Sequence, residues 1–161
     1  MPKPKTTKSE YEIQKEVVNY LEKLKLIKKI DAFTAVPNST FVPETKYKAS
    51  NGFDLGRKRI LDKNTETGVR PGFPDLTLVI QGKAYFVEIK KETRSKIQDN
   101  QKFWIKTLNF GEITAFVACS LQEVELIIED ILEQNETKNS KYFSQNLRGA
   151  KYLKEIMEFQ I

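Results

Sequence analysis

The chain has 161 residues, enough for one domain with a sizeable core and too few for two well-formed ones. Its 39% hydrophobic and 30% charged residues are typical of a globular protein, and its longest apolar runs fall far short of a membrane span. A single cysteine, Cys119, and the absence of histidine exclude an intrachain disulfide, a cysteine-rich or histidine-based zinc site and every histidine-dependent catalytic mechanism.

The charge balance favours a polyanionic partner without identifying one. The net charge is +5 and the pI is near 9.1, yet 27 basic residues against 22 acidic ones is a mild excess. The basic N-terminus, residues 1–5, leads into a polar helix and lacks the apolar segment of a secretory signal. We therefore expect an intracellular, cytoplasmic protein without membrane contact.

The first predicted helix runs from Ser9, which can cap it, to about Lys29. Its apolar residues recur at helical spacing: Ile13, Val17, Tyr20, Leu21, Leu24 and Ile27. Glu10 falls beside this stripe, which makes it an acidic residue on the packed face. Its two interpretations are a functional carboxylate and a first-turn acid favoured by the helix dipole.

A short strand is predicted over Phe33 to Val36, followed by a long segment with little periodicity, residues 39–68. We predict a loop here, with a short β-hairpin around Gly52 as an option. Its basic cluster is Arg57, Lys58 and Arg59. The cluster belongs either to a DNA-facing flap or to a solvated, variable loop.

The clearest pattern is a β-hairpin formed by Asp75 to Ile80 and Ala84 to Lys90 around a turn at Gly82. A turn centred before Gly82 places Asp75 opposite Glu88. Strand alternation puts both carboxylates on a polar face and the apolar residues of the two strands on the other.

Two opposed carboxylates need a compensating cation, and a hard divalent metal would supply it. Lys90 lies two residues beyond Glu88 on the same face, within reach of a water or a phosphate oxygen at that metal. Asp75, Glu88 and Lys90 together indicate metal-assisted hydrolysis of a phosphodiester.

Beyond the hairpin, a basic run of Lys91, Arg94 and Lys96 could hold a phosphate backbone or form ordinary solvated surface. A helix is predicted from a capping box at Ser95 to about Asn109, with Lys102 on it and with Phe103, Trp104 and Leu108 in the core. Ile113 to Cys119 is predicted as a buried parallel strand, and Leu121 to Leu132 as the helix that covers it. A helical tail follows, free to pack on its own domain or on a second subunit.

Three motifs resemble the VRR-NUC branch of the PD-(D/E)XK nucleases: Val69 to Asp75 (VRPGFPD), Glu88-Ile89-Lys90, and Gln101 to Trp104 (QKFW). The resemblance extends from about Glu10 to about Leu132. It implies an α/β/α sandwich with a central mixed β-sheet, as does the order of the elements. We expect a nuclease domain over residues 1–134 and a C-terminal helical tail over 135–161.

The resemblance implies that Glu10 reaches the metal and that Gln101 contacts the substrate or the site lysine; an exposed helical glutamine is the alternative. We expect Asp75, Glu88 and the backbone carbonyl of Ile89 to hold Mg²⁺ or Mn²⁺, with Lys90 positioning the attacking water. The expected partner is DNA, with RNA as the alternative. The expected contacts are Arg57, Lys58, Arg59, Arg70, Lys91, Arg94, Lys96 and Lys102.

Two competing functions stay open. One is a Holliday-junction-resolving endonuclease that acts as a homodimer, because VRR-NUC domains resemble junction resolvases in fold. The other is a nucleic-acid-binding or regulatory module that keeps the fold without catalysis. The intact set of Asp75, Glu88 and Lys90 argues against the second.

Overall fold

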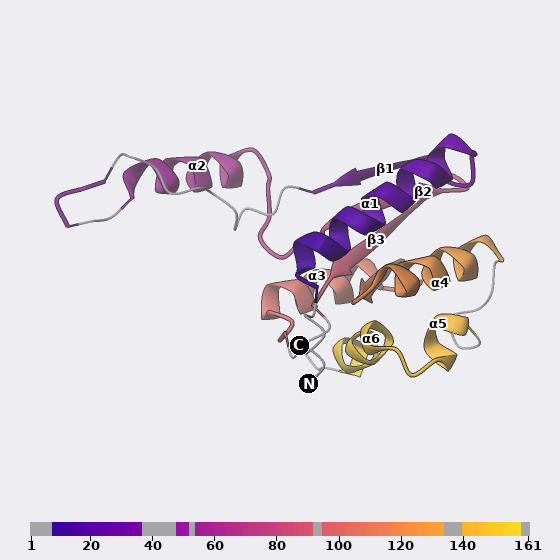
Figure 1. Ribbon diagram of the computed structural model, residues 1–161. Helices are drawn as coiled ribbons and strands as arrows, with labels where there is room; N and C mark the ends of the chain where they lie inside the picture. The colour runs from indigo at the N-terminus through magenta and orange to yellow at the C-terminus, as the bar shows by residue number, and fades with distance from the viewer. Residues whose placement is uncertain (1–7, 37–47, 52–53, 92–94, 134–139, 159–161) are drawn as a thin grey trace, which may run out of the picture.

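The computed structural model describes residues 8–36, 48–51, 54–91, 95–133 and 140–158. Helices surround a four-stranded sheet, which confirms the predicted α/β class (Figure 1). The elements follow in the order α1 (Glu10–Leu26), β1 (Ala32–Ala35), α2 (Leu55–Glu66), β2 (Leu76–Ile80), β3 (Lys83–Ile89), α3 (Asp99–Leu108), β4 (Ala115–Ala118), α4 (Leu121–Leu132), α5 (Lys141–Ser144) and α6 (Arg148–Glu158).

The sheet is mixed and has the strand order β1-β2-β3-β4. The first three strands pair antiparallel, and β4 runs parallel to β3. Leu76 pairs with Val87, which is the register predicted from the turn, and both turn residues of Gln81-Gly82 have positive φ, as a type I′ turn requires. Asp75 and Glu88 therefore face each other one position beyond the paired residues.

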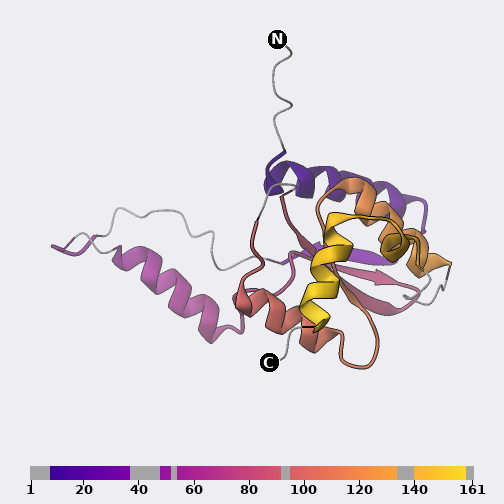
Figure 2. The ribbon, with the colours of Figure 1, turned by 90° about the horizontal axis from the view of Figure 1, so that it is seen from below.

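Helix α1 begins as predicted. The Ser9 side chain accepts the N–H of Glu12 at 3.2 Å, and the Glu12 carboxylate accepts the N–H of Ser9 at 2.7 Å. The apolar stripe is buried at Ile13, Val17, Leu21 and Leu24. Helices α1 and α4 lie on one face of the sheet and α3 on the other, which confirms the predicted α/β/α arrangement (Figure 2).

Helix α2 occupies part of the segment predicted as a loop. Asp54 caps it by accepting the N–H of Arg57 at 2.8 Å. The helix buries none of its residues and projects away from the sheet (Figures 1 and 2). A helix without a buried face has no apolar periodicity, so the pattern that reveals other helices is missing. One antiparallel bridge joins Lys48 to Asp54, and Gly52 lies outside the described residues.

Helix α3 begins at Asp99 rather than near Ser95. The N–H of Gln98 is bound by the side chain of Gln101 at 3.0 Å, so the cap lies three residues later than predicted. Trp104 is partly buried against Phe73, whereas Phe103 is 51% exposed and not a core residue.

The C-terminal helices cover the outer edge of β4. Side chains from neighbouring elements bind its outward backbone groups, namely Asn109 at Ala115, Tyr142 at Val117 and Glu123 at Cys119. The same Glu123 carboxylate accepts the N–H groups of Arg148 and Gly149, each at 3.1 Å, where α6 begins. The tail therefore packs on its own domain.

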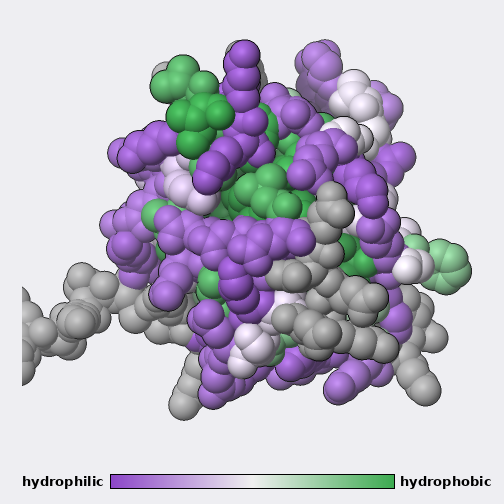
Figure 3. All heavy atoms as spheres, turned by 90° about the vertical axis from the view of Figure 1, so that its right-hand side faces the viewer, coloured by the Kyte–Doolittle hydropathy of each residue, from purple (hydrophilic) through white to green (hydrophobic). Residues whose placement is uncertain are grey.

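The face opposite α2 is mainly hydrophilic, with apolar side chains showing near its centre and at more than one edge (Figure 3). Scattered apolar groups of this kind are usual on protein surfaces. Among the helices that the structure describes, none has both the length and the apolar character needed to cross a membrane.

Candidate active site

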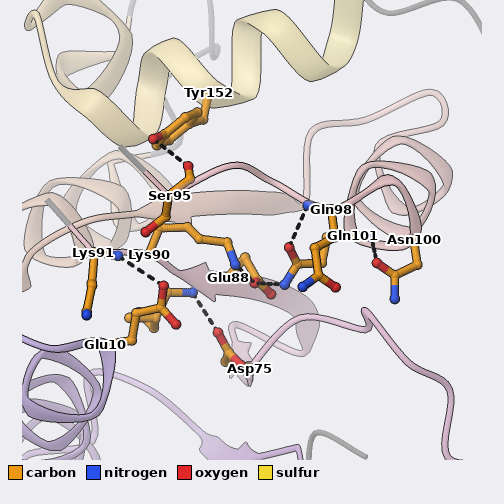
Figure 4. A network of polar contacts seen from close by, with 11 residues as sticks. Glu10, Asp75, Glu88, Lys90, Lys91, Ser95, Gln98, Asn100, Gln101 and Tyr152 are labelled. Atoms are coloured by element: carbon orange, nitrogen blue, oxygen red, sulfur yellow. Dashed lines mark hydrogen bonds and ion pairs between the residues drawn. The ribbon is translucent and has the colours of Figure 1, made fainter. Parts of the chain in front are cut away.

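Asp75 lies just before β2, and its carboxylate reaches across the hairpin. Asp75 directly precedes Leu76, the first paired residue of β2. Its Oδ2 accepts the N–H of Ile89 at 2.8 Å (Figure 4). This bond fixes the carboxylate beside the last residue of β3. The N–H and C=O groups of a strand residue point to the same neighbouring strand, so the carbonyl of Ile89 also lies on the side of Asp75.

Glu88 is the buried centre of the site, with only 1% of the residue exposed. Its Oε1 accepts two donors, Nζ of Lys90 at 2.9 Å and Nε2 of Gln101 at 2.5 Å (Figure 4). Its Oε2 is buried and has no hydrogen-bond partner among the described residues. An unpaired buried carboxylate oxygen is costly, so this atom favours a proton or a cation.

The surroundings of Glu88 oppose its negative charge. Burial, the first cause, and the charge of Asp75, the second, raise the pKa of Glu88 to about 8, and Glu10 adds to this rise. The ammonium group of Lys90 acts in the opposite direction without cancelling it. Without an added cation, the site therefore favours a proton on Glu88 up to mildly alkaline pH.

Gln101 is itself 9% exposed, and its amide is oriented by two bonds. Its Oε1 is bound to the N–H of Gln98, and this turns Nε2 towards Glu88. The structure thus places Gln101 against the buried carboxylate instead of leaving it exposed on the helix.

Gly72, in the motif before Asp75, allows the start of α3 to approach closely. A Cβ atom at Gly72 would lie 2.7 Å from Cγ of Asn100 and 2.8 Å from its backbone carbon. Gly72 also has a φ of +83°, which side chains rarely tolerate. The absence of a side chain at Gly72 therefore allows Asn100, the residue before Gln101, to lie against the motif that carries Asp75.

Glu10 lies at the rim of the site. Its Oε1 accepts the N–H of Lys91 at 3.3 Å (Figure 4). In the part of the chain that the structure describes, no three Asp, Glu, Cys or His side chains come together to hold a metal. The structure therefore does not gather Glu10, Asp75 and Glu88 into a three-carboxylate cluster.

The predicted nucleic-acid contacts spread over several elements. Arg57, Lys58 and Arg59 are exposed on α2, and Arg70 donates to the backbone carbonyl of Thr65 at 2.8 Å, near the end of that helix. The remaining contacts follow β3: Lys91 and Lys96 are exposed, Lys102 is partly buried beside Asp99, and Arg94 lies outside the described residues.

The sequence patterns did not identify two residues that lie near this network. Gln98 contributes a backbone N–H, which no side-chain pattern reveals. Tyr152 contributes a hydroxyl from α6, far along the chain, where the sequence indicated only a helical tail. A buried or partly buried tyrosine usually needs a hydrogen-bond partner. A tyrosine in an apolar helical tail could therefore have indicated a contact between the tail and the rest of the domain.

Comparison with known protein families assigns this chain to a nuclease-like family. A sequence profile described as the VRR-NUC domain matches residues 9–122, and the chain belongs to that family. The predicted family is therefore confirmed, and a nuclease-like domain of this kind implies interaction with nucleic acid.

A solved structure described as a VRR_NUC domain protein is similar to this chain, with 20% sequence identity and a TM-score of 0.48. The similarity covers 81% of this chain and 93% of the other. No curated protein sequence matches the chain.

Proposed function

We propose that this protein is a divalent-metal-dependent nuclease that hydrolyses phosphodiester bonds in DNA. The observation that carries the proposal is the state of Glu88, whose Oε1 holds two donors while its buried Oε2 has no partner among the described residues. A cation shared with Asp75 would satisfy that oxygen and offset the repulsion between the two carboxylates.

The available donors suit a hard cation. Asp75, Glu88 and the carbonyl of Ile89 would hold it, and these oxygen ligands favour Mg²⁺ or Mn²⁺ over softer metals. A bound Mg²⁺ would supply Lewis-acid polarisation of the phosphodiester and a nucleophilic water at neutral pH.

Lys90 and Gln101 provide the remaining chemistry. The Lys90 ammonium group, 6% exposed and 2.9 Å from Glu88, can position a water and stabilise charge that develops on the phosphate oxygens. Gln101 shares Oε1 of Glu88 with Lys90, which keeps Oε2 available for the cation.

Exposed basic residues would hold the DNA backbone without reading its sequence. They lie on α2, at Arg70 and along the segment after β3. The membership of the chain in a nuclease-like family supports this assignment.

Cleavage of labelled linear, nicked, flap and four-way DNA with Mg²⁺, Mn²⁺ or EDTA tests the proposal. We expect cleavage with either metal and none in EDTA. Lys90→Ala is the inactive control, and we expect it to retain DNA affinity because one cation among many contributes little to phosphate attraction. Cleavage in EDTA, or no cleavage of any substrate, would overturn the proposal. Paired cuts restricted to four-way DNA would favour the junction-resolving alternative.

A further inference from the structure

Helix α6 lies outside the residues that match the family, yet it contacts the active-site region. The match ends at residue 122, whereas α6 spans Arg148–Glu158. The helix packs on β4 and also contacts α3. Its Tyr152 reaches the segment between β3 and α3, where its hydroxyl donates to the carbonyl of Ser95 at 2.8 Å (Figure 4).

The Tyr152 hydroxyl is held on both sides. It accepts from Nε of Arg148 at 3.1 Å and from Nη2 of the same residue at 3.0 Å while it donates to Ser95. The Arg148 guanidinium also lies over the tyrosine ring, 5.4 Å from its centre. Because the two Arg148 nitrogens occupy its acceptor side, the Tyr152 hydroxyl directs its proton towards Ser95. The position of this hydroxyl therefore restricts the position of the Ser95 carbonyl.

From Ser95 a short segment leads to the buried carboxylate. Ile97 packs in the core, with 8% exposure, so the short segment has little freedom to absorb a shift of Ser95. The next residue, Gln98, donates its N–H to Oε1 of Gln101. The other end of that amide donates to Glu88. A shift of Ser95 would therefore move Gln98, turn the Gln101 amide and change the orientation of Glu88.

We infer that Tyr152 is a positioning residue that orients Gln101 and, through it, Glu88. The catalytic consequence rests on the proposed nuclease function, whereas the positioning itself does not. Tyr152→Phe removes the hydroxyl and keeps the ring. We expect kcat to fall about five- to tenfold, the loss that corresponds to one weakened hydrogen bond, with the KM for DNA unchanged.

Tyr142→Phe is the matched control. Tyr142 also donates its hydroxyl to a backbone carbonyl, that of Val117, on the outer edge of β4. Val117 pairs with Glu88 in the sheet, but this bond lies outside the segment from Ser95 to Gln101. Both substitutions remove one phenol–carbonyl bond made by the C-terminal helices. A general loss of stability would affect both variants, whereas a positioning role would affect only Tyr152→Phe.

The decisive measurement is the ¹⁵N NMR resonance of the Gln101 side-chain amide, which needs no cleavage activity. We expect it to move in Tyr152→Phe and to stay in place in Tyr142→Phe. Arg148→Met, which leaves the Ser95 bond but releases the hydroxyl, should move it less. An unmoved resonance in Tyr152→Phe, or equal movement in both tyrosine variants, would overturn the inference. A wild-type protein that cleaves no DNA would refute the proposed function and leave the NMR result valid.

Discussion

Glu88 couples the stability of the folded protein to pH. Its folded pKa of about 8 lies above the ordinary value of 4.5, so the folded state binds more protons than the unfolded state between these limits. The stabilisation from this group is fully present below pH 4.5 and is lost as the pH rises through about 8. Over that window the loss can reach a few kcal/mol.

We predict that the free energy of unfolding in EDTA, relative to Glu88→Gln, falls from pH 5 to pH 8. The variant carries no titrating group at this position and retains an oxygen for Lys90 and Gln101. Urea unfolding of both proteins at several pH values measures the difference. Parallel pH dependence would show that Glu88 titrates normally in the folded state.

Asp75→Asn isolates the charge of the second carboxylate, because an amide oxygen can still accept the N–H of Ile89. In EDTA above pH 8, where Glu88 is ionised, we expect this variant to melt higher than wild type, since the repulsion between the two carboxylates is removed. Excess Mg²⁺ should reverse the order. A bound ion stabilises the folded protein by about RT ln(1 + [L]/Kd), and the variant lacks one of the carboxylates that would hold the ion.

Asp99→Asn is the control for that comparison. It removes the charge of a carboxylate that is 93% exposed and pairs with Lys102 at 3.2 Å. Its melting temperature should shift equally with and without metal. The same parallel behaviour in Asp75→Asn would mean that Asp75 and Glu88 share no metal.

At the scale of single elements, α2 is the test of DNA contact. Replacing Arg57, Lys58 and Arg59 by Gln should weaken binding to unrelated sequences equally. It should also flatten the plot of log affinity against log salt by up to about three units, near one per lost phosphate contact. Lys58 already pairs with Asp62 at 2.7 Å, which favours a value below that limit.

Fluorescence anisotropy at several salt concentrations measures this slope. The matched control replaces Lys23, Lys25 and Lys29 by Gln, which changes the net charge equally near the end of α1. Equal slopes for the two triple variants would mean that α2 makes no contact with DNA.

The junction between the VRPGFPD motif and α3 depends on Gly72. We predict that Gly72→Ala lowers cleavage activity as well as stability, because the added methyl group displaces Asn100 beside Gln101. Gly68→Ala is the control: its φ is also positive, at +92°, but a Cβ atom there meets nothing within 4 Å. Both should lose about 1 kcal/mol of stability from backbone strain. Equal activities would show that the close contact has no catalytic effect.

The elements that the sequence predicted well are those whose patterns arise from local physics. The β2–β3 register follows from alternation and a two-residue turn, and α1 follows from its cap and buried stripe. The start of α3 was misplaced because Ser95 is a favourable cap residue and Gln98 is not. The bond from the N–H of Gln98 to the Gln101 side chain nevertheless places the cap at Gln98. Helix α2 was missed because it buries nothing.

At the scale of the whole molecule, the long-range contacts escaped prediction. The Asp75–Glu88 pair was accessible because one hairpin carries both residues. The donors from α3 and α6 converge only in the folded chain, and no spacing rule connects Tyr152 to Ser95 across 57 positions. Sequence alone could therefore identify the charged centre of the site and only part of its support.

The position of the C-terminal helices depends on the docking of α6 on β4. A Cβ atom at Gly149 would lie 2.0 Å from the carbonyl oxygen of Val117 and 2.4 Å from Oε2 of Glu123. We predict that Gly149→Ala lowers the melting temperature by several degrees, as expected for overpacking worth about 1–3 kcal/mol. Ala150→Gly, in the same helix, should cost less. Equal melting temperatures for wild type and Gly149→Ala would mean that α6 docks elsewhere.

The covering of β4 also has a consequence for how the chain folds. Residues 115–119 form an entirely apolar strand edge, and the side chains and helices that protect it come mostly from later in the sequence. Until those helices dock, the edge can pair with the same segment of another molecule. Docking of the helices is intramolecular, and its rate does not depend on protein concentration. Pairing of two such edges is intermolecular, and its rate rises with protein concentration. Docking of the C-terminal helices would therefore close this edge to other molecules.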